Sequence, residues 1–409
     1  MGFTVEHECP QCGAPIELDE TDHLLLCPFC GIKNFLFTPN YFRYILPDKA
    51  PGKEIIYAPY LRFKGNVYYC KGMTVSHRVV DITNIGLEFK GIPVSLGLRP
   101  QALKMKFVTP ETEGSFLKFT LKATDILARA GKMGSGSSAK GNILHRAYIG
   151  ETMSIIYLPM YEEKGKLFDA VLNRPITTLT EGRESLDQNI IKEPKQDISF
   201  LPILCPQCGW NMDGEKDSVV MVCGNCNTAW EARKGKFTGV NLSVTQGQQE
   251  DCEYLPFWKI SAVTRGIEIN SFADFVRITN QPRVVGEEWK NETMSFWSPA
   301  FKIRPKVFLK LSRQFTISQK QFQASDTIPN RNLHPVTLPA MEAKQALKVI
   351  LAGSTVNKKN IFPNLPQIRF DIKATSLVYL PFVDNGHELT QEHMRISISK
   401  NTLEFGRKL

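Results

Sequence analysis

The sequence predicts a strand-rich α+β protein that is internally duplicated, with a small cysteine module and a larger body in each copy. Two observations lead to this prediction. A cysteine pattern with the spacing C-x2-C-x14-C-x2-C occurs near the start of the chain and again, unchanged, 196 residues later. Tyrosine and proline motifs that follow the first cysteine pattern also recur behind the second. The 409 residues, 42% of them hydrophobic, are enough for two or three ordinary domains.

Each cysteine module contains four cysteines arranged as two close pairs. The first module has Cys9, Cys12, Cys27 and Cys30, and the second has Cys205, Cys208, Cys223 and Cys226. A C-x2-C pair places two thiolates on one tight turn, and two such turns supply the tetrahedral set of four sulfurs that zinc takes in closed structural sites. We therefore expect a structural Zn²⁺ in each module, with iron as the alternative metal. Because a closed site leaves no coordination position for a substrate, we expect it to stabilise the fold and not to catalyse.

Three of the four turns read Cys-Pro-x-Cys-Gly, and they start at Cys9, Cys27 and Cys205. In this pattern they resemble the knuckles of rubredoxin and of the zinc ribbons in transcription factor IIB and RNA polymerase subunits. The resemblance covers the two cysteine modules and implies a zinc ribbon in each. The fourth turn departs from the pattern, with Gly224 in place of proline and Asn227 in place of the closing glycine. Asparagine tolerates the left-handed conformation, so metal binding is expected there as well.

The repeat continues beyond the cysteines. Four apolar stretches carry a Tyr-x-Pro motif: Tyr57 with Pro59 and Tyr157 with Pro159 in the first copy, and Tyr254 with Pro256 and Tyr379 with Pro381 in the second. The first pair of motifs is separated by 197 residues and the last by 222, which indicates an insertion late in the second copy. Between them we match Pro100 with Pro299, at a separation of 199 residues.

Each body is expected to contain a β-meander, a helix and a closing hairpin. In the first copy the meander covers 57–82 with turns at Gly65 and Gly72, the helix covers 120–131, and the hairpin turns at 164–166. In the second copy we expect the helix at 338–353, stopped by glycine, and the hairpin turn at 384–386.

These elements divide the chain into five segments. They are zinc ribbon 1 at 1–36, β-rich body 1 at 37–172, a connector at 173–200, zinc ribbon 2 at 201–235 and β-rich body 2 at 236–409. The connector is rich in Thr, Glu, Lys and Asp and has little apolar periodicity, which is typical of a loop.

The Tyr-x-Pro strands are expected at sheet edges or bends, because proline cannot donate a hydrogen bond to a neighbouring strand. Two alternatives follow: the motif fixes a local bend, or some of these edges accept a strand from a partner protein. A Tyr-x-Pro strand after a ribbon also resembles a loose group of bacterial zinc-ribbon proteins of the transcription-factor-IIB type. The function of that group is largely unassigned, so the resemblance implies a context without an activity.

The net charge of +9 invites a nucleic-acid interpretation, but the charge is unevenly distributed. Residues 1–36 carry six carboxylates against one lysine, a formal charge of −5, and residues 201–232 carry four against one, a formal charge of −3. Acidic ribbons are poorly suited to phosphate and should instead meet a basic protein surface, either in the chain's own bodies or in a partner. Any contact with RNA or single-stranded DNA is expected from the bodies, through Lys302, Arg304, Lys306, Lys310 and Arg313.

Three further predictions concern interactions and compartment. All five tryptophans lie in the second copy, which makes it the better candidate for a partner contact, with Trp258 and Trp297 as test positions. The chain has no long apolar run and no secretory signal, and it is therefore expected in the cytoplasm. Outside the modules, Cys70 and Cys252 are expected to be buried free thiols.

No catalytic pattern is recognised among the histidines or serines, and we expect no enzymatic activity. The sequence thus favours a non-enzymatic, zinc-binding scaffold or adaptor that mediates protein contacts in a bacterial cytoplasmic or membrane-peripheral assembly. A nucleic-acid-associated zinc-ribbon factor of transcription or replication is the first alternative. A rubredoxin-like electron carrier with iron is the second. The oligomeric state is left open, since a duplicated chain has internal pseudo-symmetry as a monomer or a dimer.

Overall fold

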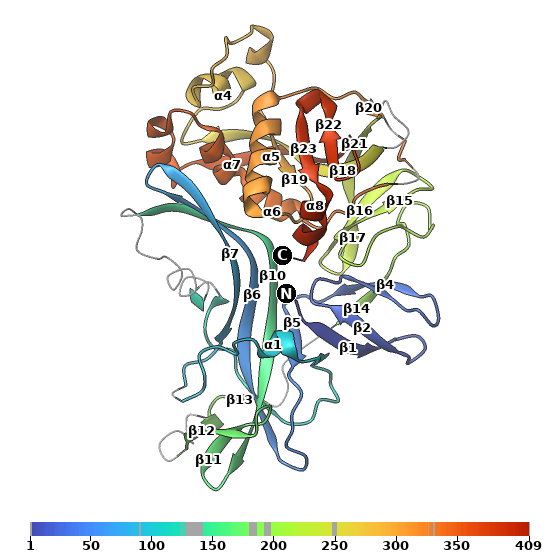
Figure 1. Ribbon diagram of the computed structural model, residues 1–409, viewed down its shortest axis with the longest axis vertical. Coiled ribbons are helices and arrows are strands. Elements are labelled where there is room, and N and C mark those ends of the chain that lie inside the picture. The colour runs from blue at the N-terminus through green and yellow to red at the C-terminus, as the bar shows by residue number, and fades with distance from the viewer. Residues whose placement is uncertain are drawn as a thin grey trace. The chain divides into compact units, whose positions relative to one another are not determined.

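A computed structural model describes residues 2–89, 91–123, 125–126, 142–179, 186–191, 198–247, 252–325, 327–329 and 332–408 (Figure 1). The predicted strand-rich α+β class is confirmed. The chain forms two compact units: unit 1 contains 1–64, 80–138 and 152–202, and unit 2 contains 65–79, 139–151 and 203–409. The units therefore interleave along the chain, whereas the division into ribbons, bodies and connector stays a prediction made from the sequence.

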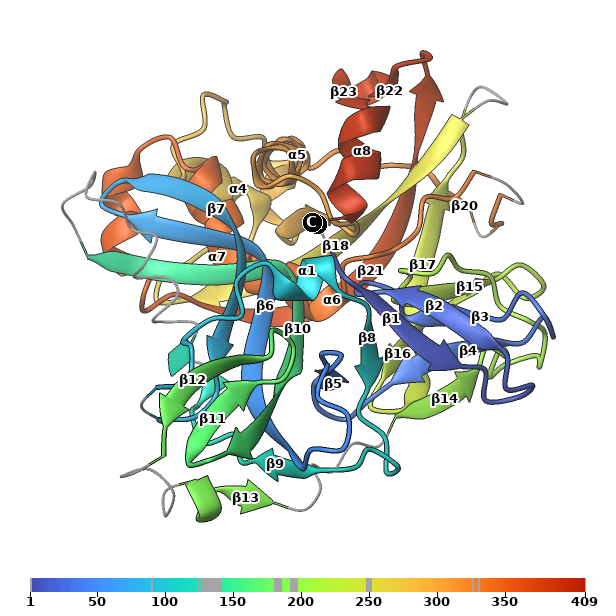
Figure 2. The ribbon, with the colours of Figure 1, turned by 60° about the horizontal axis from the view of Figure 1, so that its bottom comes forward.

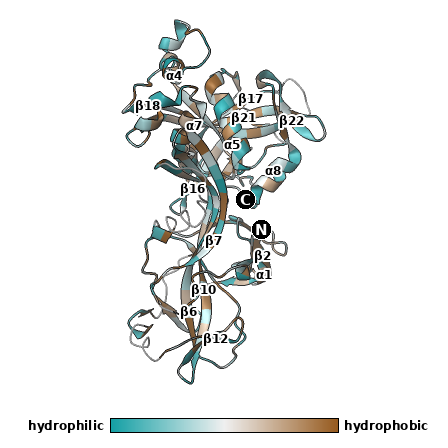
Figure 3. Cartoon of the chain, turned by 60° about the vertical axis from the view of Figure 1, so that its left-hand side comes forward, coloured by the Kyte–Doolittle hydropathy of each residue, from teal (hydrophilic) through white to brown (hydrophobic). Residues whose placement is uncertain are grey.

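Unit 1 is built on one large sheet with the strand order β13-β9-β6-β10-β5-β8-β1-β2 and a small sheet with the order β14-β4-β3. The elements of this part of the chain are β1 (Thr4–Glu8), β2 (Pro15–Asp19), β3 (Leu24–Leu26), β4 (Lys33–Phe37), β5 (Phe42–Ile45), β6 (Ile55–Lys71), β7 (Thr74–Ile85), α1 (Arg99–Ala102), β8 (Met105–Phe107), β9 (Ser115–Leu117), β10 (Ile143–Glu163), β11 (Lys166–Asp169), β12 (Arg174–Thr178), β13 (Ile190–Ile191) and β14 (Ser199–Pro202). Strands β6, β7 and β10 contribute residues to both units. Apolar residues recur along β6 and β10, and Tyr60 and Leu158 are fully buried there (Figure 3).

Unit 2 has its own sheet, with the order β15-β16-β17-β21-β18-β19, and a layer of helices. Its strands are β15 (Val220–Cys223), β16 (Thr228–Arg233), β17 (Lys236–Thr245), β18 (Cys252–Arg265), β19 (Ser295–Pro299), β20 (Ala324–Ser325), β21 (Arg369–Asp384), β22 (Glu388–Gln391) and β23 (Ile396–Ser399). Its helices are α4 (Phe272–Ile278), α5 (Pro305–Ser318), α6 (Ala340–Gln345), α7 (Leu347–Ser354) and α8 (Lys400–Arg407), with short 3-10 turns η1 (Glu288–Lys290), η2 (Lys358–Asn360), η3 (Phe362–Asn364) and η4 (Glu392–Met394). The core between sheet and helices includes Trp258, Phe308 and Ile350.

The duplication is visible in the strand pairing. In the first copy β5 runs parallel to β10 and places Ile45 opposite Tyr157, and in the second β17 runs parallel to β21 and places Val244 opposite Tyr379. After the predicted closing hairpins, each copy adds one more antiparallel strand, β12 beside β11 and β23 beside β22 (Figure 2). Asn173 between the first two strands and Arg395 between the second two share a positive φ, 52° and 53°, at a separation of 222 residues. The same register and the same unusual backbone angle at matching positions support a duplicated unit.

The Tyr-x-Pro strands lie inside their sheets, paired with one another. Tyr254 of β18 faces Pro381 of β21, and Pro256 faces Tyr379. A proline has no N–H group, so the strand edge beside it lacks one hydrogen-bond donor. In each of the four motifs the chain itself covers this edge, because the proline carbonyl accepts a hydrogen bond from another segment. The donors are Gly86 N for Pro59, Ala170 N for Pro159, Ala300 N for Pro256 and Gln391 Nε2 for Pro381, at 2.8, 2.9, 3.0 and 3.4 Å. This favours the local-bend interpretation, and a partner strand at these motifs is not supported.

One match between the copies and one predicted turn are wrong in the structure. Pro100 lies in α1, whereas Pro299 ends β19, so the two prolines are not equivalent. The structural counterpart of Ala300 is Gly86, because both carbonyls accept two consecutive backbone N–H groups, those of residues 337 and 338 and of 120 and 121. Gly65 does not form a turn but lies within β6, where a Cβ would approach Glu151 Cα to 3.0 Å.

Other local predictions have mixed outcomes. The turn at 164–166 is confirmed, with positive φ at Lys164 and Gly165 as a tight hairpin requires, and so is the turn at 384–386. The second helix is confirmed as α6 and α7, although Gly353 lies inside α7 and does not end it. The first predicted helix, 120–131, falls largely outside the described residues. Within the predicted connector, residues 174–178 form β12, the counterpart of β23.

Candidate metal centres

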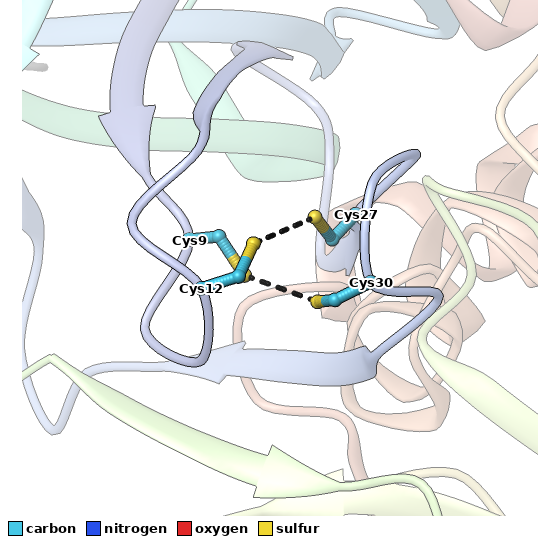
Figure 4. Close-up of side chains that lie close together, drawn as sticks. All are labelled: Cys9, Cys12, Cys27 and Cys30. Carbon is cyan, nitrogen blue, oxygen red and sulfur yellow. Dashed lines mark hydrogen bonds between the residues drawn. The ribbon is translucent and has the colours of Figure 1, made fainter.

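The first metal-binding candidate is formed by two hairpins of module 1, residues 1–36. Cys9 and Cys12 lie on the turn between β1 and β2, and Cys27 and Cys30 lie on the turn between β3 and β4 (Figure 4). Each turn is closed by two backbone hydrogen bonds around the first cysteine. Cys9 N donates to Ala14 O at 2.8 Å and Gly13 N donates to Cys9 O at 2.9 Å, and the second turn repeats this pattern around Cys27.

The glycine that ends each of these turns is required by the backbone. Gly13, Gly31 and Gly209 have φ of 71°, 73° and 73°, in the left-handed region that glycine adopts without a steric penalty. The Cys-Pro-x-Cys-Gly pattern therefore specifies a local geometry as well as a pair of thiols.

The eight predicted ligands converge as two groups of four, in each of which all sulfur atoms lie within 4.8 Å of one another. The Sγ atoms of Cys9 and Cys30 are 3.7 Å apart, as are those of Cys12 and Cys27. In the second group the corresponding distances are 3.5 and 3.6 Å, from Cys205 to Cys226 and from Cys208 to Cys223. Four sulfurs around a tetrahedral metal at about 2.3 Å lie about 3.8 Å apart, so both groups fit one ion each.

Backbone N–H groups point at the sulfur atoms and favour their ionised form. The N–H groups of Cys30 and then of Phe29 lower the pKa of Cys27 to about 6. Burial opposes ionisation at Cys205, but the N–H groups of Cys208 and Gln207 lower its pKa to about 6. At other ligands the balance is opposite: burial and the neighbouring thiols raise the pKa of Cys30 and of Cys223 to about 12, although backbone N–H groups oppose the shift. Metal binding requires four thiolates, so the turns favour ionisation of Cys27 and Cys205, and the charge of the metal would have to ionise the rest.

The fourth turn, where the sequence departs from the knuckle pattern, keeps the same conformation. Asn227 takes the place of the closing glycine with φ of 54°, as expected for asparagine. The Thr228 hydroxyl lies 3.0 Å from Cys226 Sγ, and the Trp230 indole donates to that hydroxyl at 2.9 Å. The indole leaves the hydroxyl proton free to point at the sulfur, a supporting interaction typical of metal sites.

Module 1 is attached to its own unit through its acidic residues. The buried Arg62 of β6 pairs with the buried Glu20 at 2.8 Å and also contacts Asp81. On the exposed side, Lys104 pairs with Glu17. Strand β1 continues the sheet by pairing with β8 through two residues. The basic protein surface expected for this module is therefore supplied, at least in part, by the chain itself.

Module 2, residues 201–235, is attached to unit 2 mainly by one continuous hairpin ladder. Strand β16 pairs with β17 over five residues, and Val219 N donates to Val336 O at 2.8 Å. Arg407 of α8 pairs with both Asp217 and Glu215. Here too the acidic side chains meet cations of the same unit.

The structure separates the other predicted residues into exposed and buried sets. Arg304, Lys306, Lys310 and Arg313 are exposed at and along α5, but Lys302 is buried and is not available to a polyanion.

Trp258 and Trp297 are 1% and 2% exposed, so the proposal that they contact a partner is wrong; of the five tryptophans only Trp210 is exposed. Cys70 and Cys252 are buried thiols as predicted, and burial raises the pKa of Cys70 to about 12.

Sequence reasoning missed the residues that support the sites. Arg62 lies 42 residues from Glu20, and nothing in the local pattern links them. Thr228 and Trp230, by contrast, stand two and four positions after Cys226, and the missing glycine at 227 was a signal that other groups must complete that turn.

Comparison with known proteins adds no assignment to this geometry, since no family model, no curated protein and no solved structure matches the chain. In the described part of the chain, no helix has the length and apolar character needed to cross a bilayer.

Proposed function

We propose that the protein is a non-enzymatic scaffold or adaptor of the cytoplasm in which two zinc ions stabilise ribbon-like modules and the bodies bind other proteins. The observation that supports this most directly is the closed geometry of the two four-cysteine groups. All four tetrahedral positions are taken by protein sulfur, so a metal held there has no position for substrate or water. We also propose that both modules are ribbons of the transcription-factor-IIB type, as their knuckle sequences imply.

Zinc is proposed over iron because closed four-thiolate sites are typical of structural zinc. The test is metal analysis of protein purified without added metal or chelator. Two zinc ions per chain and a colourless solution are expected. A red protein that bleaches on reduction would instead assign the sites to iron and favour the electron-carrier alternative.

The protein-binding role is tested by purification of the tagged full-length chain from its native cell, with and without nuclease, followed by mass spectrometry. A defined set of proteins that survives both nuclease and physiological salt is expected. If only nucleic acid and its associated proteins are retained, and nuclease releases them, the scaffold proposal is wrong.

The nucleic-acid alternative rests on one specific feature, the exposed basic residues of α5. Lys306, Lys310 and Arg313 recur at helical spacing and so project from one side of the helix. Phosphate binding there should weaken steeply as salt rises, because each neutralised phosphate releases counterions. Single-stranded RNA that binds at low salt and is lost after replacement of these three residues by glutamine would favour this alternative.

A further inference from the structure

A large groove opens in unit 1 and takes no part in metal binding. It has a volume of about 1480 Å³ and lies between the β1–β2 hairpin on one side and two loops, 48–54 and 109–114, on the other. Small-molecule sites are typically about 300–1,000 Å³. The groove is therefore large enough for a segment of polypeptide.

The floor of the groove is apolar and its rim is acidic. Ile16, Ile45, Ile55, Tyr57 and Phe107 line the floor. The charged lining residues are the carboxylates of Glu6, Glu8, Glu17, Asp48, Glu54, Glu111 and Glu113, and the two lysines Lys53 and Lys106. Seven carboxylates against two ammonium groups leave a formal charge of −5 on a chain whose net charge is +9. Two ion pairs outside the lining have opposite effects on this charge: Lys53 pairs with Glu163, whereas Lys104 pairs with Glu6 and Glu17. They offset each other, and the five other carboxylates keep the groove acidic.

The loop 109–114, which carries Glu111 and Glu113 of the acidic rim, is held in place by close contacts and a hydrogen bond. Gly114 has φ of 125°, and a Cβ on it would approach Ile55 O to 2.7 Å and the Tyr57 ring to 2.9 Å. The loop before it is closed by a hydrogen bond from Thr109 N to Thr112 Oγ1 at 2.9 Å. Burial and then the charges of Asp48 and Glu113 raise the pKa of Tyr57 to about 12, so carboxylates of both rim loops act on the floor of the groove.

One wall of the groove is held in place by aromatic contacts of His7. His7 lines the groove from β1, and its ring stacks on Phe200 at 5.6 Å and packs edge-on against Phe107 at 5.2 Å. These contacts fix the ring, yet its Nε2 atom is buried and has no hydrogen-bond partner among the described residues. Because that atom is closed to solvent, it lies behind the surface of the groove and offers no contact to a ligand in this conformation.

In the second copy the corresponding space is smaller, a pocket of about 350 Å³ between module 2 and the segment from Asn332 to Val336. Phe116 pairs with Tyr57 in parallel in the first copy, and Leu333 does so with Tyr254 in the second. In the second copy the segment after Leu333 then bridges directly to module 2, through Val336 and Val220. In the first copy the residue equivalent to Val336 is Phe119, and no β-bridge in the described ranges joins it to module 1.

We propose that the acidic groove of unit 1 binds an extended, lysine- or arginine-rich segment of a partner protein. The proposal rests on the proposed scaffold function and names the chemistry of its partner. In an extended segment alternate side chains point to opposite sides, so apolar residues can face the floor while basic residues reach the rim. Charge complementarity selects this occupant, because an acidic or neutral segment would gain nothing from the rim carboxylates.

The test is titration of the full-length, zinc-loaded protein with a fluorescent peptide of alternating lysine and valine, followed by anisotropy. The groove variant replaces Glu54, Glu111 and Glu113 by glutamine, and the matched control replaces Glu268, Glu392 and Glu404, which are exposed carboxylates of unit 2. All six substitutions avoid the cysteine modules, and zinc content and thermal unfolding verify the fold. We expect the groove variant to bind about tenfold more weakly and the control to bind as the unchanged protein does.

The remaining outcomes separate the possible failures. Equal binding to both variants, or equal binding of a glutamate-for-lysine peptide, would overturn the groove proposal while leaving the scaffold function intact. Self-association that the groove variant abolishes would identify a second copy of the chain as the occupant and also overturn it. If the tagged protein retains no partner from its native cell but the groove peptide still binds as expected, the scaffold proposal fails and the groove assignment stands.

Discussion

The two copies share a framework but attach their cysteine modules differently. Module 2 joins its body through five residue pairs of β16 and β17 and a further bridge to Val336. Module 1 joins its body through only two residue pairs of β1 and β8 and the buried pair of Arg62 and Glu20, and its β4 pairs over four residues with β14, outside the body. The first arrangement leaves a pocket of about 350 Å³ beside the module, whereas the second leaves the acidic groove of about 1480 Å³. The proposed binding groove thus belongs to the copy whose module shares the shorter ladder with its body.

The largest expected effect comes from metal loss, and it should differ between the copies. Cys27→Ser and Cys223→Ser should each lower the zinc content from two ions to one, since apparent zinc binding in small finger peptides is about 10–16 kcal/mol. We expect Cys223→Ser to reduce the thermal stability of the protein more, because module 2 shares the longer ladder with its body. Calorimetry of both variants with zinc analysis tests this, and a larger loss for Cys27→Ser would contradict it.

The second effect concerns the charged residues that anchor the modules. Arg62→Met leaves the carboxylate of Glu20 buried without its cation and should lower the free energy of unfolding by about 3–5 kcal/mol. Arg407→Met is the matched change in unit 2, where Glu215 is about half exposed but Asp217 is mostly buried, and where the arginine side chain itself is 28% exposed. It should therefore cost less than Arg62→Met, about 1–3 kcal/mol. Urea unfolding measures both. The double change of Arg62→Met with Glu20→Gln should recover part of the loss, and equal costs at the two arginines would refute the distinction.

The third effect is a pH dependence that belongs to unit 2. Burial, and then the charge of Glu151, raise the pKa of Glu342 to about 7 from 4.5, although Lys302 and the N–H groups of Gly150 and Glu151 oppose the shift. The folded protein therefore binds a proton between pH 4.5 and 7 that the unfolded chain releases. Stability should fall as pH rises through this window, by about 3 kcal/mol.

Glu342→Gln provides the test of this pH dependence. The amide oxygen can still accept from the backbone N–H of Glu151, which lies 3.2 Å from Glu342 Oε2, but it does not titrate. Urea unfolding at pH 5 and pH 7 should therefore show a smaller difference in the variant than in the unchanged protein. An unaltered difference would assign the pH dependence to other groups, such as Glu151.

The smallest effect tests the residue equivalence between the copies. A Cβ at Gly86 would lie 2.3 Å from the ring of Phe119. In the second copy the equivalent of Gly86 is Ala300, and the smaller Val336 stands at the position of Phe119. Gly86→Ala should therefore destabilise by about 1–3 kcal/mol through overpacking. Adding Phe119→Val should restore part of this, and a double-mutant cycle measures the coupling. Additive effects would argue against the equivalence.

What the sequence revealed depends on how local each feature is. The cysteine turns were predictable because spacing, proline and glycine specify them within five residues, and even the exception at Asn227 follows from backbone preference. The hairpins were predictable for the same reason. The match of Pro100 with Pro299 failed because sequence likeness alone did not place the insertion between Pro256 and Ala300, which contains α4 and not the late segment of the second copy. The pairing of Arg62 with Glu20 and the groove are set by long-range contacts, which a local pattern does not report.

The interleaving of the units along the chain has a consequence for synthesis. Tyr68 and Ile149 belong to the core of unit 2, and the Tyr68 ring packs on Phe308, which lies 240 residues later in the chain. At about 5–20 residues per second, the ribosome delivers that partner roughly 10–50 s after Tyr68. During this interval β6 and β10 carry apolar residues that have no core to enter. Co-translational folding of this protein therefore includes a stage at which β6 and β10 have been synthesised but their unit 2 residues are still exposed. At this stage chaperone binding competes with aggregation.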